Sequence, residues 1–379
     1  MAQQSFLVLS ANTPWVYALA EALARDCPTH AVRFYDWRNY VRLRPTWPDR
    51  PVPEALSRSM QTLPPGYAGR LEWLFRPYVR SLVRRWGDRL QRQSGDYPVV
   101  IAPYPYLAPW VRNVPSDRLI YYNLDDYRLY EPHRQDWILE REAQLVERAA
   151  MVLCLSGFQV AALQKRYPHK AESIHHFPLG VAQSYLNPDP DRPPEPKTVG
   201  YIGNLGDRVD WQLVQEVASG CVEVTFVFVG STNEDGNSID SSNWQTHRQK
   251  ALALPNVRHI DKVPQDKVTQ YYRSFAMSWI PYVVTHPFNQ AACPTKIMDG
   301  IASGRPVLST DIPESRVYPD WIEIFRSPQE AIDRIRVCLD SPTHSASKQL
   351  EFARQNTWPV RAVELQRILQ ERVLTDGYT

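Results

Sequence analysis

The sequence predicts an α/β protein made of two doubly wound halves, each a parallel sheet covered by helices on both faces. Three observations predict this class. Short apolar runs alternate with helical stretches, a proline-rich polar stretch interrupts the alternation near the middle, and the alternation then restarts. The chain has 379 residues, which suits two to three domains at roughly 150 residues each. Length and pattern therefore agree on two α/β domains.

The first half opens with an apolar run at 5–10, a loop containing Pro14 and Trp15, and a helix over 16–24. Such a strand, loop and helix form the start of a βα unit. The remaining expectations for this half are strands at 99–102, 119–122 and 151–155 and a helix over 136–150.

Residues 187–197 read NPDPDRPPEPK and have no apolar period. This composition is typical of a linker between domains. The second half then has expected strands at 198–202, 224–229, 257–260, 277–280 and 306–309, a helix over 210–218, and a polar loop over 230–249. In such sheets ligands bind beyond the carboxyl ends of the strands.

Composition excludes several classes of protein. Lys and Arg total 43 against 41 Asp and Glu, and this balance argues against a dedicated nucleic-acid binder. The five cysteines show no C-x-x-C spacing, so neither zinc nor a disulfide framework is expected. No apolar run approaches the roughly 20 residues that span a bilayer, and the N-terminus does not resemble a signal peptide. A cytoplasmic protein is expected.

The basic residues are concentrated in one segment. Between Arg33 and Arg92 there are 13 Arg, no Lys and 5 acidic residues. Within 70–92 the spacing of apolar residues predicts an amphipathic helix with a basic side; the apolar positions are Leu71, Leu74, Phe75, Tyr78, Leu82, Trp86 and Leu90. Two interpretations fit, a solvated helix on a domain core or a peripheral contact with an anionic membrane or acceptor.

Residues 292–306, ACPTKIMDGIASGRP, form the strongest local pattern. Pro294 suits a helix start, and the glycine and proline at 304 and 306 suit its end. The first turn would hold Thr295 and Lys296, where free N–H groups and a full positive charge favour an anion. Asp299 lies one turn deeper, where a carboxylate can bind a ribose diol. The alternative is a Lys296–Asp299 surface pair.

Two further segments follow predicted strands. Residues 200–206, GYIGNLG, form a glycine-containing turn that lets backbone approach a phosphate, or only a tight βα turn. Arg208 and Asp210 come just after it. Asp125 and Asp126 follow the strand at 119–122. One of this pair could act as a general base, or both could cap a loop or helix.

Several motifs together resemble one family. These are GYIGNLGDRVDW at 200–211, LPNVRHIDKVP at 254–264, Ile280-Pro281-Tyr282, CPTKIMDGIASGRPVLST at 293–310 and NTWPVRA at 356–362. The chain resembles GT-B fold glycosyltransferases of the family 4 type, most of all bacterial exopolysaccharide and teichuronic-acid-type transferases. The first half resembles them more loosely, through Pro14-Trp15, residues 122–127 and Gly180-Val181.

The resemblance implies a GT-B architecture, with two Rossmann-like domains facing each other across a cleft. It places the acceptor-side domain at 1–186, the linker at 187–197, the nucleotide-sugar domain at 198–355, and a helix at 356–379 that returns to the first domain. It also implies transfer of a sugar from a nucleotide diphosphate donor to a hydroxyl acceptor, without a metal or other cofactor. The donor would be a UDP-sugar or a GDP-sugar.

The resemblance also implies roles for individual residues. Asp126 or Asp125 would be the base, and Asn12 and Trp15 would lie on the acceptor side. The donor-side residues would be Gly203, Asn204, Arg208, Asp210, Val263, Tyr282, Thr295, Lys296 and Asp299. The segment Asp189-Pro190-Asp191 matches the pattern of a metal-binding D-x-D motif but lies in the linker. No metal-binding residue is therefore assigned.

The sequence departs from many relatives at two positions. They carry two glutamates eight positions apart, where this chain has Ala291 and Asp299. Because Ala291 has no carboxylate, an inverting displacement with an aspartate base is favoured. The same departure leaves open an inactive sugar-nucleotide sensor or partner subunit, or a sugar-nucleotide epimerase, on this fold. The expected partners are a nucleotide sugar and a glycan or lipid-linked acceptor, the latter at the inner face of the plasma membrane.

Overall fold

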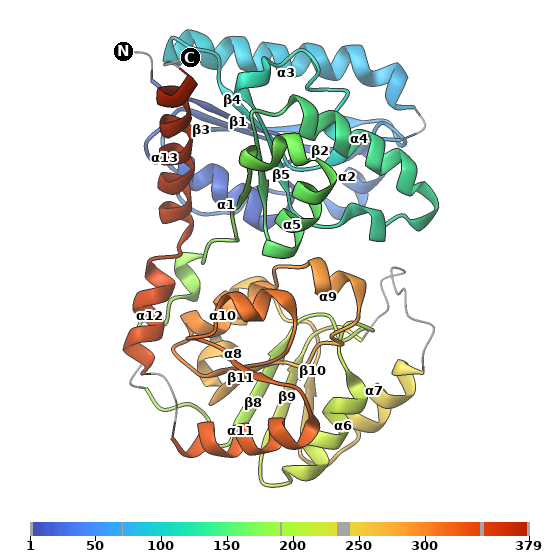
Figure 1. The fold of residues 1–379 in the computed structure, drawn as a ribbon, viewed down its shortest axis with the longest axis vertical. Helices are drawn as coiled ribbons and strands as arrows, with labels where there is room; N and C mark the ends of the chain where they lie inside the picture. Colours follow the sequence, from blue (N-terminus) through green and yellow to red (C-terminus); the bar gives the residue numbers. More distant parts are fainter. Residues whose placement is uncertain (1–2, 70, 190–191, 233–242, 342–344, 377–379) are drawn as a thin grey trace. The chain divides into compact units, whose positions relative to one another are not determined.

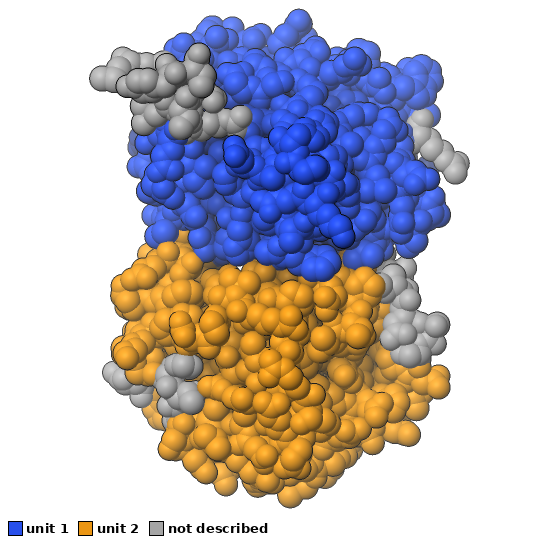
Figure 2. All heavy atoms as spheres, viewed as in Figure 1, with its two compact units in different colours: residues 1–180, 358–379 blue, residues 181–357 orange. Residues whose placement is uncertain are grey.

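The structure is a computed structural model that describes residues 3–69, 71–189, 192–232, 243–341 and 345–376. The chain divides into two compact units. Unit 1 comprises residues 1–180 and 358–379, and unit 2 comprises residues 181–357 (Figure 2).

Unit 1 is built on a seven-stranded sheet in the order β3-β2-β1-β4-β5-β6-β7 (Figure 1). All its strand pairs are parallel. The strands are β1 (Phe6–Val8), β2 (Thr29–Asp36), β3 (Leu56–Leu63), β4 (Val99–Ala102), β5 (Leu119–Asn123), β6 (Met151–Cys154) and β7 (Ile174–His176). The helices are α1 (Pro14–Leu23), α2 (Trp37–Leu43), α3 (Glu72–Ser94), α4 (Gln135–Arg148), α5 (Gly157–Arg166) and α13 (Trp358–Asp376).

Unit 2 is built on a six-stranded parallel sheet in the order β10-β9-β8-β11-β12-β13. Its strands are β8 (Thr198–Ile202), β9 (Thr225–Val229), β10 (Val257–Ile260), β11 (Met277–Ile280), β12 (Val307–Thr310) and β13 (Glu323–Phe325). Its helices are α6 (Trp211–Gly220), α7 (Trp244–Leu252), α8 (Gln265–Ser274), α9 (Pro287–Ala291), α10 (Thr295–Ala302), α11 (Pro328–Asp340) and α12 (Ala346–Arg354).

The central strands are apolar throughout because helices cover both faces of each sheet. All four residues of β4 and all five of β5 are buried. In both sheets the strand order reverses beside the first strand, between β1 and β4 in unit 1 and between β8 and β11 in unit 2. Such a switch point opens a crevice at the carboxyl ends of its two strands. The turns after β8 and β11 therefore come together in unit 2.

The unit boundary differs from the expected domain boundary at 186. Segment 181–186 belongs to unit 2, and so does the proline-rich segment 187–197 apart from residues 190 and 191, which are not described. The Asn187 amide N–H donates to the Ala302 carbonyl, and its side chain donates to the Ser303 carbonyl. The Glu195 N–H donates to the Ser274 carbonyl. These bonds attach the segment to unit 2 at both of its ends.

The last helix, α13, belongs to unit 1 and packs against α1. Among its described side chains the buried apolar residues are Trp358, Ala362, Leu365 and Leu369. The chain enters α13 at Trp358, beside Gly180. A β-carbon on Gly180 would lie 2.8 Å from the Trp358 Cα atom, so the chain passes close to itself there.

Two expected elements differ in extent. The segment expected as a polar loop, 230–249, contains the first residues of α7, and positions 233–242 lie outside the described residues. The basic amphipathic helix is present as α3. Its buried residues are Glu72, Val79, Val83, Gly87, Leu90 and Ser94, so the expected apolar positions Leu71, Leu74 and Tyr78 remain exposed. Arg70 lies outside the described residues.

Candidate functional site

The turn after β8 reaches the first turn of α10. Gly203 has a φ of +152°, and its N–H donates to the Val229 carbonyl at 2.9 Å. A β-carbon added to Gly203 would lie 2.6 Å from Lys296 Cε and 2.7 Å from Lys296 Nζ. Only a residue without a side chain allows this approach.

Helix α10 holds Thr295 and Lys296 in its first turn, after Pro294 as N-cap. The helix ends before Gly304, which has a φ of +71°. This left-handed residue ends the helix as the sequence predicted. Lys296 Nζ lies 5.3 Å from the Tyr201 ring centroid and 5.7 Å from that of Tyr282. A positive charge and free helix N–H groups therefore meet at one place, which favours an anion.

Arg208 supplies a second cation. Its guanidinium carbon lies 5.2 Å from the Tyr282 ring centroid. Its Nε donates to Asn289 Oδ1 at 2.8 Å, and the Asn289 amide donates in turn to the Arg208 carbonyl at 2.9 Å. Asn289 is fully buried, so this reciprocal pair fixes the arginine. The sequence analysis missed Asn289 because it lies 81 residues from Arg208 and no local motif marks it.

Tyr282 lies between the two cations. Burial alone would raise its pKa, but the positive charges of Lys296 and Arg208 lower the pKa to about 8. A lowered pKa for a buried phenol reports a strongly positive local potential. Tyr201, the buried neighbour on β8, lies with its ring centroid 6.3 Å away, and its hydroxyl donates to the Asn204 carbonyl at 3.0 Å. The Gly203 turn, Lys296, Arg208 and Tyr282 thus form one cluster with two positive charges.

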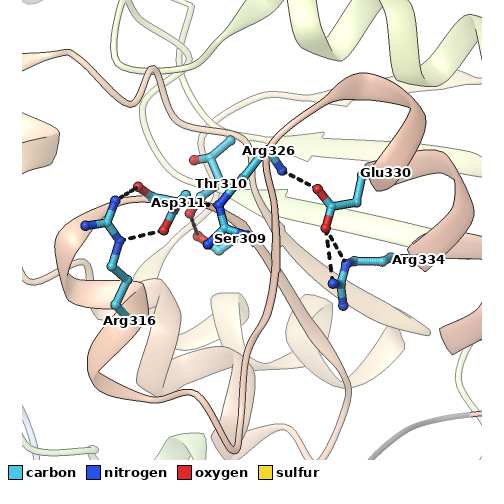
Figure 3. A network of polar contacts seen from close by, with 7 residues as sticks. All are labelled: Ser309, Thr310, Asp311, Arg316, Arg326, Glu330 and Arg334. Atoms are coloured by element: carbon cyan, nitrogen blue, oxygen red, sulfur yellow. Dashed lines mark hydrogen bonds and ion pairs between the residues drawn. The ribbon is translucent and has the colours of Figure 1, made fainter.

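Thr310, the last residue of β12, holds the Tyr282 backbone. Its hydroxyl donates to the Tyr282 carbonyl at 2.9 Å and accepts from the Tyr282 N–H at 3.2 Å. The next residue, Asp311, is held by two arginines (Figure 3). Arg316 Nε donates to it at 2.6 Å and Arg326 Nε at 2.9 Å. These hydrogen bonds, first that from Arg316, hold the pKa of Asp311 below its usual value.

The same network continues into α11. Glu330 accepts from the Arg326 backbone N–H at 2.9 Å and from Arg334 Nη2 at 3.1 Å (Figure 3). The carboxyl ends of β12 and β13 are therefore fixed to the start of α11. Thr310, which precedes Asp311 in the chain, connects these contacts to the Tyr282 backbone.

Asp299 lies one turn along α10 from Lys296. Burial raises its pKa to about 7, against the opposing effects of the Lys296 charge and a hydrogen bond from Thr295. The negative charge of Asp299 also contributes, after burial, to the raised pKa values of Tyr185 and Tyr272. A carboxylate with this pKa is unusual and marks a candidate binding position.

Three other expected donor-side residues have contacts of their own. Asp210 is the N-cap of α6 and accepts from the Leu213 N–H at 3.0 Å. Val263 packs in a small apolar cluster with Val229 and Phe275. Asn204 is exposed and contributes its carbonyl to the Tyr201 contact. Gly203, Arg208, Tyr282, Thr295, Lys296 and Asp299 are the members that the structure brings together.

The paired aspartates of unit 1 follow β5. Both carboxylate oxygens of Asp126 are bound by the Arg128 side chain, at 2.7 Å from Nε and 2.5 Å from Nη2. Asp125 instead accepts from the Tyr130 hydroxyl at 2.6 Å and from the Asp126 N–H at 2.9 Å. Both oxygens of Asp126 are therefore held by a guanidinium.

The two expected acceptor-side residues follow β1. Asn12 is tied to β2, because its amide donates to the Phe34 carbonyl at 2.9 Å and its oxygen accepts from the Phe34 N–H at 3.2 Å. Trp15 lies in the first turn of α1, and its indole N–H is buried without a hydrogen-bond partner. Asn12 thus has a structural role, whereas Trp15 retains an unused donor.

Within the described residues, no three or more His, Cys, Asp or Glu side chains gather as a metal site would require. Pro190 and Asp191 of the D-x-D spelling lie outside those residues. The described helices include none that is long and apolar enough to cross a bilayer.

Comparison with protein families finds a likeness in unit 2. The model of the family described as "Glycosyl transferases group 1" matches residues 196–339. This part of the chain is therefore similar to glycosyl transferases of group 1. The matched residues include every expected donor-side residue from Gly203 to Asp299, and Asp125 and Asp126 lie outside them.

One curated relative is "Putative teichuronic acid biosynthesis glycosyltransferase TuaH" of Bacillus subtilis, which is 25% identical over 218 residues. The alignment covers 55% of this chain and 53% of that protein, so the match spans about half the length of each.

Solved structures match over nearly the whole chain. Anabaena Alr3699/HepE in complex with UDP and glucose has a TM-score of 0.68 at 16% identity and covers 97% of this chain and 100% of its own. Sucrose-phosphate synthase from Thermosynechococcus elongatus has a TM-score of 0.64 at 15% identity and covers 98% and 100%. These likenesses confirm the expected GT-B fold class.

Proposed function

We propose that the protein is a glycosyltransferase that moves a sugar from a nucleoside diphosphate donor to a hydroxyl acceptor. The main observation behind this proposal is that Lys296 and Arg208 both lie close to the Tyr282 ring. They lie at the switch point of the unit 2 sheet, within the residues that match the glycosyl transferases group 1 model. Two fixed cations beside a glycine turn suit a diphosphate better than a single charge does. Asp299 would hold the ribose, and Val263 would lie near the base.

The chemistry follows from where charge develops. The acceptor oxygen forms a bond to the anomeric carbon of the sugar, and the bond from that carbon to the β-phosphate oxygen breaks. The electron pair of the broken bond stays on the β-phosphate. Lys296, the Thr295 amide and hydroxyl, and the Gly203-Asn204 turn would stabilise that negative charge. We propose that these groups act without a metal ion, so a chelator should leave the rate unchanged.

The acceptor hydroxyl must lose its proton during the transfer. We propose Asp125 as the base in preference to Asp126, because Arg128 binds both oxygens of Asp126. A carboxylate whose two oxygens are both bound by a guanidinium is a poor proton acceptor, because the positive charge stabilises its ionised form. Direct displacement with this base would invert the anomeric configuration. Trp15, with its unused indole N–H, would lie on the acceptor side.

We propose a UDP-sugar as the donor, with a GDP-sugar as the alternative, and a polysaccharide or glycolipid precursor as the acceptor. The support for the donor is that the similar HepE structure holds UDP and glucose. The support for the acceptor is the name of the TuaH relative, which cites teichuronic acid biosynthesis.

The test is calorimetric binding of UDP, GDP, ADP and dTDP, followed by transfer assays with the sugar nucleotide of the tightest binder. We expect one nucleotide to bind clearly best and the matching donor to be consumed only with acceptor present. Binding by none of the four would contradict the donor site. Conversion of the donor without any acceptor would indicate an epimerase instead.

A second candidate function is a sugar-nucleotide sensor without transferase activity. The observation that favours it is Ala291, which is buried at the end of α9 where many relatives have a glutamate. The sensor would bind the nucleotide sugar but neither hydrolyse nor transfer it. Consumption of the donor in the presence of an acceptor would exclude this candidate.

A further inference from the structure

Helix α2 of unit 1 has no buried residue. A globular protein normally buries the apolar face of a surface helix, yet α2 exposes four large apolar side chains, with Val41 67% exposed. They are Trp37, Tyr40, Val41 and Leu43. The helix is nevertheless well formed, because Asp36 caps it by accepting from the Asn39 N–H at 2.8 Å. The apolar face of α2 is therefore presented to the surroundings.

The start of α3 also exposes large apolar side chains. Four large apolar residues at or near its N-terminus are exposed, with Trp73 66% exposed. They are Leu71, Trp73, Leu74 and Tyr78. Fifteen large hydrophobic residues are exposed in the described part of the chain, and eight of them lie in these two segments. Scattered exposed apolar residues are ordinary, but such a concentration marks an interaction surface.

The two segments leave the sheet at neighbouring positions. Strands β2 and β3 are adjacent and parallel, and their last registered pair is Asp36 with Leu63. Helix α2 begins directly after Asp36, and the segment leading to α3 begins directly after Leu63. Tyr67 of that segment is close to β2, because the charges of Asp36 and Tyr35 add to the effect of burial in raising its pKa. We call the eight residues together the α2–α3 surface.

The charge of this surface is positive and is carried mainly by α2. Arg38, Arg42 and Arg44 are exposed there, and none of the three forms a salt bridge among the described residues. In α3, by contrast, Arg76 is paired with Glu72 at 2.7 Å and Arg80 donates to the Pro109 carbonyl at 2.6 Å. Apolar and aromatic residues flanked by unpaired arginines are the composition of an interfacial membrane anchor.

We propose that the α2–α3 surface binds the surface of an anionic lipid bilayer, with its tryptophans at headgroup depth and the α2 arginines on the lipid phosphates. The middle of α3 does not insert, since its apolar residues Val79, Val83 and Leu90 are buried in unit 1. The proposed membrane contact therefore consists of α2 and the first two turns of α3, and not of the whole basic segment 70–92. The proposal does not depend on the glycosyltransferase function.

The test is flotation of the full chain with vesicles of phosphatidylcholine alone and of phosphatidylcholine mixed with phosphatidylglycerol. We expect binding to the anionic vesicles only, and weaker binding as salt is raised. The variants Trp37→Ser with Val41→Ser, and Trp73→Ser with Leu74→Ser, should each reduce binding about tenfold or more. The matched control is Val222→Ser with Val337→Ser, two exposed apolar residues of unit 2, which should bind as the unchanged protein does.

A second pair of variants tests whether vesicle binding depends on the arginines of α2 or on the positive charge of the protein in general. Arg38→Gln with Arg42→Gln should weaken vesicle binding by roughly fivefold per arginine. Arg84→Gln with Arg85→Gln removes two exposed arginines from the middle of α3 and should have a clearly smaller effect. All variants should keep the melting temperature of the unchanged protein, which shows that they are folded.

Two results would overturn the proposal. The first is that the unchanged protein does not float with anionic vesicles, or that the variants with serine in place of apolar residues float as well as the unchanged protein does. The other is concentration-dependent self-association in light scattering that the same variants abolish. That second result would assign the surface to contact between two copies of the chain.

Discussion

The side chain of Lys296 occupies the space that a β-carbon on Gly203 would need. The position of that β-carbon is 2.6 Å from Lys296 Cε, well inside van der Waals contact. The backbone of the turn and the ammonium of the lysine are therefore brought together by the absence of a single methyl group. This relationship makes the glycine part of the proposed phosphate site.

Gly203→Ala should displace Lys296 and lower nucleoside diphosphate affinity at least tenfold. It should also lower the free energy of unfolding by about 1–3 kcal/mol, because φ at +152° is strained for alanine. The matched control is Gly206→Ala, whose β-carbon would meet Asn204 Oδ1 at an ordinary 3.6 Å. Calorimetric titration of both variants measures the difference, and equal affinity in the two would show that the close approach is irrelevant to binding.

Lys296→Ala should lower nucleotide affinity by roughly 10- to 100-fold, the effect of losing a charge-assisted hydrogen bond of about 1.5–3 kcal/mol. Its melting temperature should stay close to that of the unchanged protein, since Lys296 is only half-buried. Lys267→Ala, which removes an exposed lysine of α8, is the control. If both Lys296→Ala and Asp299→Ala bind nucleotide normally, the donor site lies elsewhere.

Asp299 should make stability fall as the pH rises. Its pKa is raised from 3.8 to about 7 in the folded chain, so between about pH 4 and pH 7 the folded state holds a proton that the unfolded state has released. Its contribution to stability is therefore complete below pH 4 and is lost as the pH passes 7. Asp299→Asn removes this dependence and should gain about 4 kcal/mol over the unchanged protein between pH 4 and pH 8. Urea unfolding across this range measures the gain.

The same ionisation should act on binding in the opposite direction. Ribose hydroxyls donate to a carboxylate better than to a neutral acid, so nucleotide affinity should increase as the pH rises through 7. Asp299→Asn should bind more weakly, with a pH dependence that comes only from the nucleotide phosphates. A parallel pH profile for the two proteins would remove Asp299 from the site.

Asp125→Asn should reduce turnover by roughly 10²- to 10⁴-fold, the usual contribution of a general base, while donor affinity and melting temperature stay unchanged. Asp126→Asn should instead lower stability by about 1 kcal/mol, because it breaks a partly exposed ion pair with Arg128. Comparing single-turnover transfer with thermal melting separates the two roles. Full transfer by both variants would mean that neither aspartate is the base.

Parallel strands with continuous apolar sequence were predictable from the sequence. Strand β4 begins and ends where its apolar run VVIA does, because a covered parallel strand needs no polar alternation. The bounds of β8, β10 and β11 also agree with the prediction. β3 was not predicted. Its sequence LSRSMQTL is mostly polar and is tolerated because β3 is an edge strand, paired only with β2.

The residues of the candidate site that lie close together in the sequence could be predicted from it. Thr295, Lys296 and Asp299 share one helical turn, and that spacing was enough to group them. The reciprocal Arg208–Asn289 pair required the fold, since it joins two segments that only sheet order brings together. Nothing in the sequence indicated that Asp210 is also the N-cap of α6, because that role depends on where the helix begins.

The return of α13 to unit 1 bears on the order in which the chain can fold during synthesis. Residues 181–357 form one uninterrupted unit, so the whole of unit 2 is synthesised between the two parts of unit 1. Every strand of the unit 1 sheet is made before unit 2, yet α1 lacks its partner until α13 has been made. A segment that follows unit 2 therefore completes the unit that was begun first, and a chain cut after Thr357 would leave the α13-facing surface of α1 uncovered.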